Sequence, residues 1–275
     1  MRTTSAASTT ARRTSPAATS SKGQPEDQRP QHLCRGSGEV LKDVAGTCNG
    51  SGWVGIKEPE DEDDGSGITR AQIDYIDQYL EQTDATIFGA DFEDPDTGWR
   101  RYLDEASTID FVIAMELTKN YGANMRSSVF MYKQRDPDLA TPGELNFGPI
   151  WDFDTSMGNI DFNFPGGLAS AEGWWISEPN PEITADQSDY TWFHRLHEDD
   201  QFVSRLEARW AEVHTGLRAS DGFIVQQQGI IATSAAANVQ RWPEMAGWST
   251  DVSFVRSWLD DRFAWLDDQY DYTGP

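Results

Sequence analysis

Two short runs rich in strand-forming residues lie near the middle of the chain, with helical periodicity on either side of them. The runs cover residues 128–133 and 144–151, and the loop between them, 134–143, contains Pro137 and Pro142. Branched and aromatic side chains favour strands, and a proline-containing connection between two such runs predicts a β-hairpin with a long tip. The pattern therefore predicts the α+β class.

Apolar residues recur at the spacing of amphipathic helices before and after this hairpin. On the N-terminal side they predict a helix over residues 68–87 with Thr69 as its N-cap. A second helix is predicted to start at Ser107 or Thr108 and to stop near Gly122. On the C-terminal side the same spacing predicts helices that begin near Trp192, run from Phe202 to Val213, run from Ser220 to Trp242, and begin at Thr250. The expectation is a central hairpin followed by a helical C-terminal subdomain.

The N-terminal part of the chain lacks this periodicity. Residues 1–21 are almost entirely Ser, Thr, Ala and Arg, and Pro25 and Pro30 follow. Such a composition buries too little apolar area to offset the entropy of ordering. Residues 1–45 are therefore predicted to be a disordered leader or linker ahead of a domain over residues 46–275. An apolar central region is the mark of a secretory signal peptide, and this stretch has none.

The charge balance excludes one large class of function. The chain has 46 acidic and 22 basic residues, a formal net charge of −24, and such a surface repels phosphate, so nucleic acid is not an expected partner. No apolar stretch approaches the ~20 residues that a helix needs to cross a bilayer, so no membrane span is expected. The cysteines, Cys34 and Cys48, are too few for a four-ligand zinc site. Whether they pair stays open from the sequence, as does the oligomeric state.

The residues that most suggest chemistry follow the second predicted strand. Asp152 and Asp154 stand at positions i and i+2, which in an extended backbone point to the same side. Carboxylates that close repel each other unless a cation compensates, and Mg²⁺ or Mn²⁺ prefers such hard oxygen ligands together with substrate phosphates. The segment that begins at Gly158 could close over a ligand held there. The alternative is that one carboxylate caps the following turn and the other is only solvated.

Four motifs in a fixed order give the chain a resemblance to a known family. They are Glu116-Leu-Thr-Lys-Asn120, Ser128-Val-Phe-Met-Tyr-Lys133, Gly148-Pro-Ile-Trp-Asp-Phe-Asp154 and Gly158-Asn159. With further landmarks upstream and downstream they span about residues 50–270, and this part of the chain resembles the spore-coat kinase family CotH. No single motif is decisive, and the specificity lies in their shared order.

The resemblance implies an atypical protein-kinase-like fold that transfers the γ-phosphate of ATP to Ser of coat or secreted proteins. Asp152 then stands where kinases place a metal-binding aspartate, with Asp154 assisting it, and the implied cofactors are ATP and Mg²⁺ or Mn²⁺. Lys57 is implied near the nucleotide, with a solvated lysine as the common alternative. Arg126 could contact phosphate or form an ordinary salt bridge. The implied location is extracellular, at the cell surface or in a spore coat.

Two departures from the family pattern bear on catalysis. The family has Asn-x-Asp after the Glu-Leu helix, the Asp acting like the base of a kinase catalytic loop, whereas this chain has Asn120-Tyr121-Gly122. Asn124 could take the place of that Asp, but an amide cannot accept a proton. The N-terminal lobe is also incomplete, with only a fragment around Lys57. We therefore expect a CotH-like kinase with Asn120 and Asn124 at the catalytic position, or a non-catalytic coat or surface protein, a pseudokinase.

A third hypothesis is a glycoside-active or sugar-binding protein. Its basis is the carboxylate pair together with Trp174, Trp175 and Trp192, which could stack on sugars. Glycosidase carboxylates lie roughly 5 Å or more apart on opposite sides of the sugar, which residues i and i+2 of one strand do not provide, so this hypothesis ranks last. His194 and His197 have a metal-binding spacing, but without an evident third ligand a structural or surface role is predicted for both.

Overall fold

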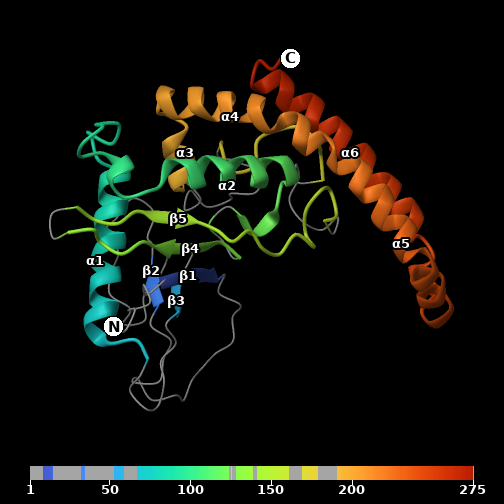
Figure 1. Ribbon diagram of the computed structural model, residues 1–275, viewed down its shortest axis with the longest axis horizontal. Helices are drawn as coiled ribbons and strands as arrows, with labels where there is room; N and C mark the ends of the chain where they lie inside the picture. Colours follow the sequence, from blue (N-terminus) through green and yellow to red (C-terminus); the bar gives the residue numbers. More distant parts are fainter. Residues whose placement is uncertain are drawn as a thin grey trace, which may run out of the picture.

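The computed structural model describes residues 67–123, 125, 128–138, 141–160, 169–178 and 191–274, together with the backbone of three strands that precede them. Figure 1 shows the arrangement: α2 lies along the hairpin β4–β5, α1 crosses the tip end of that hairpin, and α3 and α4 lie on the far side of α2. The helices α5 and α6 extend away from this body as an antiparallel pair. The predicted α+β class is confirmed.

The sheet has the strand order β2-β3-β1-β4-β5, and all neighbouring strands are antiparallel. Its strands are β1 (Thr9–Thr14), β2 (His32–Cys34), β3 (Trp53–Glu58), β4 (Phe130–Lys133) and β5 (Leu145–Phe147). The strands β4 and β5 form the predicted hairpin, in which Met131 pairs with Phe147. Met131 and Lys133 point into the core, whereas Tyr132 lies on the opposite face and is exposed. The inner face of the hairpin is the one that the helices cover.

Strand β5 is shorter than the run 144–151 predicted for it. It ends at Phe147, because Gly148 has a φ of 131°, a backbone conformation that glycine adopts far more readily than other residues. The residues after Gly148 therefore leave the sheet. Asp152 has a φ of 67°, so the prediction that an extended backbone points Asp152 and Asp154 to the same side is wrong.

Helix α1 (Arg70–Ile87) begins where the sequence predicts. The hydroxyl of Thr69 accepts a hydrogen bond from the Gln72 amide at 3.3 Å, and the Gln72 side chain accepts one from the Thr69 amide at 2.8 Å. This reciprocal capping box satisfies two amides that the first turn would otherwise leave without partners. The helix buries one apolar stripe, in which the Tyr79 hydroxyl donates to the Gly143 carbonyl at 2.9 Å. That bond ties α1 to the hairpin tip.

Helix α2 (Glu105–Thr118) is the central buried helix. Its N-cap is Asp104, whose carboxylate accepts from the Ser107 amide at 2.7 Å, so the prediction of Ser107 or Thr108 as the cap is wrong. The carboxylate three residues earlier occupies the capping position, and the Thr108 hydroxyl donates back to the Asp104 carbonyl instead. The helix ends at Thr118 rather than near Gly122, because Lys119 adopts a left-handed conformation with φ 45°. The short helix η3 (Tyr121–Ala123) follows.

The C-terminal part is helical, as predicted. Its elements are α3 (Trp192–Leu196), α4 (Asp200–Arg218), α5 (Ser220–Arg241), η5 (Pro243–Met245) and α6 (Trp248–Gln269), and the remaining short helix, η2 (Trp99–Arg101), lies between α1 and α2. Helix α6 has Gly247 as its N-cap residue, so the predicted start at Thr250 is wrong by less than a turn. Among the described residues, no helix is both long enough and apolar enough to cross a membrane.

Candidate functional site

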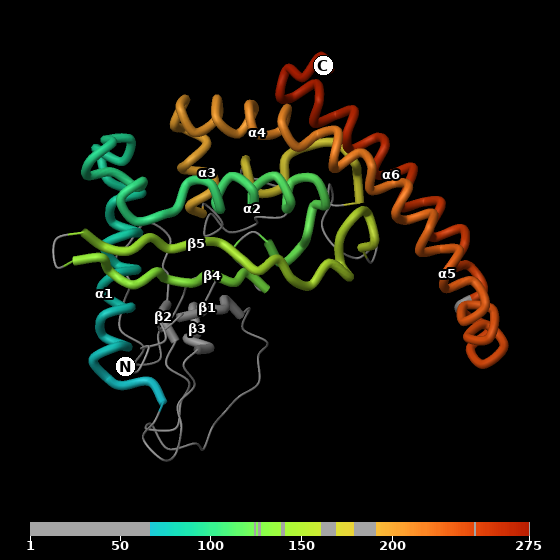
Figure 2. The backbone as a smooth tube through the Cα atoms, viewed as in Figure 1, coloured from blue at the N-terminus to red at the C-terminus, as the bar shows by residue number. Residues whose placement is uncertain are grey.

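The candidate site lies at the base of the hairpin, where the end of α2 meets the loop that follows β5. The Met157 amide donates to the Thr118 carbonyl at 2.7 Å, and the Tyr121 amide donates to the Thr155 carbonyl at 3.1 Å. Figure 2 shows both segments on the same side of the body. The structure thus brings together the Glu-Leu motif and the Asp152 motif, which are about thirty residues apart in the sequence.

Asn120 connects these two segments through its side chain. Its Nδ2 donates to the Asp152 carbonyl at 2.9 Å and to the Trp151 carbonyl at 3.3 Å, and its Oδ1 accepts from the Gly122 amide at 2.9 Å. Asn120 is buried, with 2% of its surface exposed. Since the amide is engaged on both sides, this arrangement positions the Asp152 backbone against the end of α2.

Asp152 and Asp154 both present exposed carboxylates at this point. Asp152 Oδ2 accepts a hydrogen bond from the Ser128 hydroxyl at 2.7 Å, and the Asp154 carbonyl accepts from Asn159 Nδ2 at 2.7 Å. No group of three or more His, Cys, Asp or Glu side chains among the described residues is arranged to hold a metal ion. A divalent ion here would therefore need oxygen ligands beyond the two carboxylates, such as phosphate and water, which is how Mg²⁺ is usually held. The donor set fits a metal that arrives with a nucleotide.

Strained backbone is concentrated around these residues. Positive φ values occur at Lys119 (45°), Met125 (55°) and Ser128 (56°) between α2 and β4, and at Asp152 (67°) and Met157 (51°) after β5, whereas Asp271 (49°) lies apart, after α6. Side chains other than glycine adopt this region at a cost of order 1–3 kcal/mol each, and such residues cluster at functional sites. The strained backbone thus marks this region as a candidate site, and it could not be predicted from sequence periodicity or composition.

Three of the other residues predicted for the site lie outside the part of the chain that the structure describes. Asn124 and Arg126 lie outside the described residues, as does the side chain of Lys57 on β3. Gly122 is buried in η3 and donates its amide to Asn120. Their predicted roles therefore stay predictions.

A buried ion pair beside the site was not predicted from the sequence. Arg262 on α6 donates through Nη2 to Glu116 Oε2 at 2.8 Å and through Nε to the Glu116 carbonyl at 2.9 Å, and both side chains are fully buried. Glu116 Oε1 also accepts from the amides of Ile176 and Ser177 and from the Ser177 hydroxyl, at 2.7–2.8 Å. Glu116 belongs to the Glu-Leu motif, and its contacts fix α2, α6 and residues 175–177 in one place. Because Glu116 and Arg262 are 146 positions apart, no local sequence pattern indicates that they pair.

Lys119 extends this network from the end of α2. Its Nζ donates to the Glu172 carbonyl at 2.6 Å and to the Ser170 carbonyl at 3.1 Å. Burial lowers the pKa of Lys119 to about 7, with the nearby Arg262 charge as the second cause. The segment around residue 172 is thus held from two sides, by Lys119 and by Arg262, whose Nη1 donates to the Gly173 carbonyl.

The tryptophans considered for sugar stacking are packed instead. Trp175 is 1% exposed and donates its Nε1 to the Asn120 carbonyl, and Trp192 is 2% exposed and donates to Asp84 Oδ1 at 2.8 Å. Trp174 packs edge-on against Trp265 with ring centroids 5.0 Å apart. The packing of these three rings contradicts the sugar-binding hypothesis, which the sequence analysis ranked last.

The histidines on and after α3 are also structural. His194 Nδ1 accepts from the Thr191 amide at 2.9 Å, which closes the capping box of α3. Burial lowers the pKa of His194 to about 4 and also lowers that of His197, so both rings are neutral at pH 7. The structural role predicted for the pair agrees with this packing.

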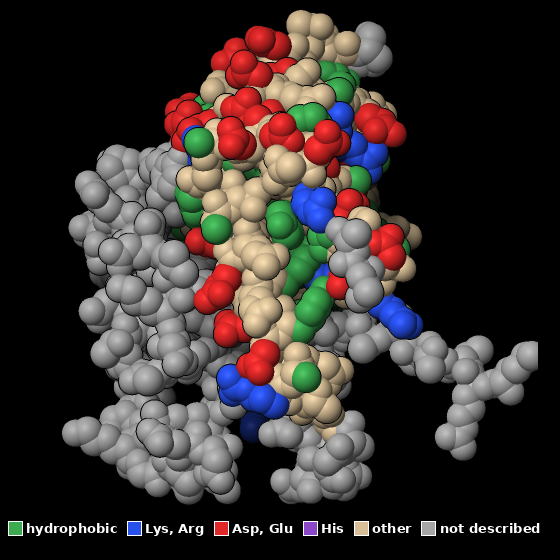
Figure 3. All heavy atoms as spheres, turned by 90° about the vertical axis from the view of Figure 1, so that its left-hand side faces the viewer, with side chains coloured by type: hydrophobic (Ala, Val, Ile, Leu, Met, Phe, Trp, Pro, Cys, Tyr) green, Lys and Arg blue, Asp and Glu red, His purple; other side chains and the backbone are tan. Residues whose placement is uncertain are grey.

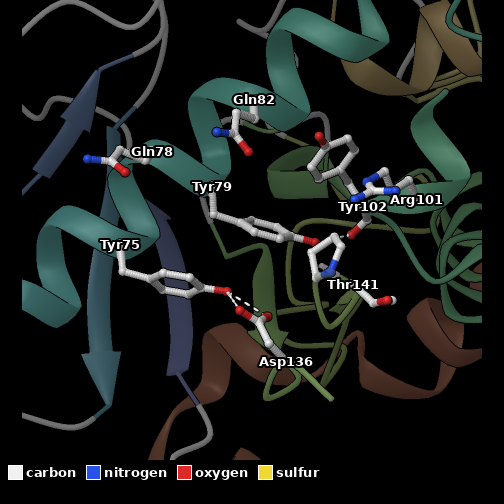
Figure 4. A pocket seen from close by; sticks show the side chains of 9 residues that line it. Tyr75, Gln78, Tyr79, Gln82, Arg101, Tyr102, Asp136 and Thr141 are labelled. Atoms are coloured by element: carbon white, nitrogen blue, oxygen red, sulfur yellow. Dashed lines mark hydrogen bonds between the residues drawn. The ribbon is translucent and has the colours of Figure 1, made fainter. Parts of the chain in front are cut away.

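A separate cavity of about 200 Å³ lies between α1 and the hairpin tip (Figure 4). Tyr75 and Tyr79 line it from α1, and the Tyr75 hydroxyl donates to the Asp136 carboxylate at 2.7 Å. That carboxylate also accepts from Lys133 Nζ and from the Gly143 amide. Since Asp136 lies at the tip and Asp152 follows the base of the hairpin, the cavity is distinct from the carboxylate site. Figure 3 shows the α1 side of the molecule, with acidic side chains gathered over its upper part.

The fold and the site together define an α+β protein with a pair of exposed carboxylates on a loop held against the end of a buried helix. Comparison with protein families gives a match to the family described as CotH kinase protein, over residues 49–266. The chain belongs to this family, and the resemblance seen in its motifs is confirmed. The comparison with curated proteins gives no match. The family indicates a kinase-like or pseudokinase function, general use of ATP with a divalent metal, a protein substrate, and a spore-coat or surface location.

Proposed function

We propose that this chain binds Mg-ATP or Mn-ATP at Asp152 and Asp154 and transfers phosphate to Ser of a coat or surface protein. The observation that carries the proposal is the pair of exposed carboxylates on a loop that Asn120 and Ser128 hold in place. Phosphoryl transfer requires mainly that ATP is positioned and its charge neutralised. A divalent ion bound with ATP supplies that neutralisation, and the two carboxylates are the residues that would hold it.

An exposed apolar surface beside the carboxylates supports nucleotide binding. Ile150 and Trp151 are the two residues before Asp152. They are 53% and 58% exposed. The Trp151 ring packs edge-on against Phe130 of β4, with centroids 6.3 Å apart. An adenine base can stack on such a surface while its phosphates extend toward the carboxylates. Lys57 and Arg126 are the proposed cationic contacts to those phosphates.

The proposed reaction is slow because a general base is missing. At the position where the family has Asp this chain has Gly122, and the amide of Asn120 is occupied by backbone groups. General base catalysis contributes typically about 10²–10⁴-fold, and the loose transition state of phosphoryl transfer makes the loss tolerable. Binding and charge neutralisation are thus the contributions proposed for this chain.

Transfer of labelled γ-phosphate from ATP to a serine-rich acceptor such as casein tests the proposal. Asp152→Asn keeps an acceptor for Ser128 and suits the left-handed backbone, which Asn tolerates, but it removes the charge. Transfer should fall at least ~100-fold in this variant. The control Asp96→Asn removes an exposed carboxylate before η2 and should match the parent. Equal transfer by all three proteins would contradict the assignment of Asp152.

A pseudokinase is the second candidate, and Gly122 favours it. In that case the parent binds Mg-ATP but transfers no phosphate. Gly122→Asp places a carboxylate at the position of the missing base. Transfer that appears only in this variant would show that the natural chain has lost catalysis while keeping its nucleotide site.

A further inference from the structure

Helix α5 has an unusual position in this protein. No residue of α5, all of which the structure describes, is buried, and Figure 1 shows the helix extending with α6 away from the body. Phe223 is 61% exposed and Ile230 is 65% exposed. A helix of 22 residues that leaves large apolar side chains in solvent has a face suited to a partner.

Three of the exposed apolar residues of α5 form a stripe. Phe223, Ile230 and Ala237 are spaced by seven residues, so they lie on one side of the helix, as in the seam of a coiled coil. The residues beside the stripe are uncharged and polar: Gln226, Gln227, Thr233 and Ser234. At ~100° per residue, Val225 lies about 200° and Ile231 about 80° around the helix from Phe223, so both exposed side chains are outside the stripe.

The charge of α5 differs from that of the rest of the chain. Its 22 residues include one acid, Asp221, and one base, Arg241, while the whole chain carries a formal net charge of −24. Two copies of so acidic a protein repel each other over most of their surfaces. The neutral stripe of α5 is a surface through which two copies can approach without that repulsion.

The order of residues along the stripe fits a second copy in antiparallel orientation. If a two-fold axis passes at Ile230, each Phe223 faces the Ala237 of the other copy, a large side chain against a small one, and the two Ile230 side chains meet. Asp221, which pairs with Arg256 of α6, lies about 160° around the helix from Phe223 and takes no part in this contact. A two-fold interface requires such self-complementarity, because the same patch serves both copies.

We propose that α5 is the interface of a homodimer in which two α5 helices pack antiparallel about Ile230. This proposal is independent of the phosphate-transfer site. The helix is about 33 Å long, and a single helix–helix contact is at the low end of interface sizes, so a dissociation constant on the order of 10 μM is expected. Raising the salt concentration should strengthen the dimer, since salt screens the repulsion between the acidic bodies.

Sedimentation equilibrium of the full chain, from about 1 to about 100 μM, tests the proposal. Ile230→Glu puts two carboxylates against each other at the axis and should weaken association at least ~10-fold. The matched control Val225→Glu adds the same charge to the same helix outside the stripe, at a residue 44% exposed, and should dimerise as the parent does. Circular dichroism and melting temperature of both variants check that α5 still folds.

A second variant tests the register. Ala237→Phe places a large side chain opposite Phe223 of the other copy and should also weaken the dimer. A parent that stays monomeric throughout the concentration range would overturn the proposal, and a different partner would then have to cover the stripe. Equal weakening by Val225→Glu and Ile230→Glu would overturn it as well, because it would move the interface off the stripe.

Discussion

Glu116 and Asp152 are carboxylates of two motif segments that touch, yet their environments are opposite. Glu116 is fully buried and accepts hydrogen bonds from Arg262, Ser177 and three backbone amides. Asp152 is exposed and accepts from Ser128. A buried and fully paired carboxylate holds the structure together, whereas an exposed one can take a ligand. Membership in a motif therefore does not by itself give a residue a chemical role.

Breaking the buried pair should have the largest effect on stability. Arg262→Met removes the cation and leaves Glu116 charged in a dry environment, which typically costs about 3–5 kcal/mol. Urea denaturation of parent and variant measures the difference. Exposed Arg218, which pairs with Asp260 at 2.9 Å, provides the control, since Arg218→Met should cost less than about 1 kcal/mol. Equal losses at the two sites would contradict the structural role given to Glu116.

Acidification should destabilise the protein through His194. Its pKa is lowered to about 4 in the folded state from an ordinary 6.5, so the unfolded chain takes up the proton first. The contribution is present above pH 6.5 and is lost as the pH falls toward 4, by about 3 kcal/mol at most. His194→Gln keeps an N3 residue suited to the capping box without titrating. Urea denaturation at several pH values gives the free energy of unfolding as a function of pH. Between pH 6.5 and 4 this free energy should fall less steeply in the variant than in the parent. The same slope in both proteins would contradict the role given to His194.

Removing the Asn120 side chain, which connects the end of α2 to the loop after β5, should have an intermediate effect on stability. Asn120→Ala deletes the side-chain bonds to Gly122, Trp151 and Asp152, and a loss of about 2 kcal/mol is expected. Amide hydrogen exchange of residues 150–157 should accelerate more than that of α1. Uniform acceleration in both places would mean that Asn120 stabilises the whole fold rather than the loop.

The smallest change in stability is expected at the exposed carboxylate. Asp152→Asn should alter the free energy of unfolding by less than about 1 kcal/mol, because the side chain is in solvent and Asn accepts the same hydrogen bond. The same urea titration measures it. A loss comparable to that of Arg262→Met would show that Asp152 is structural, and the contrast with Glu116 would disappear.

The parts of the fold that depend on local sequence could be predicted. Thr69 caps α1 because the capping box is contained in four residues, and the hairpin and the bounds of α5 follow from turn residues and spacing. The cap of α2 was missed because two hydroxyl residues follow the Asp104 that takes the position. At the site, the sequence singled out Asp152 and Asp154 after a strand predicted to reach residue 151, whereas the strand stops at Gly148 and Asp152 has a left-handed backbone. The partners of Glu116 lie on distant segments, and only the tertiary structure brings them together.

Calorimetric titration of the full chain with Mg-ATP tests the central claim most directly, in the parent, Asp152→Asn and the control Asp96→Asn. We expect saturable binding by the parent and the control, and affinity at least ~10-fold weaker in Asp152→Asn, since a carboxylate that holds the metal is lost. Equal affinity in all three proteins would contradict the assignment of the nucleotide site to Asp152.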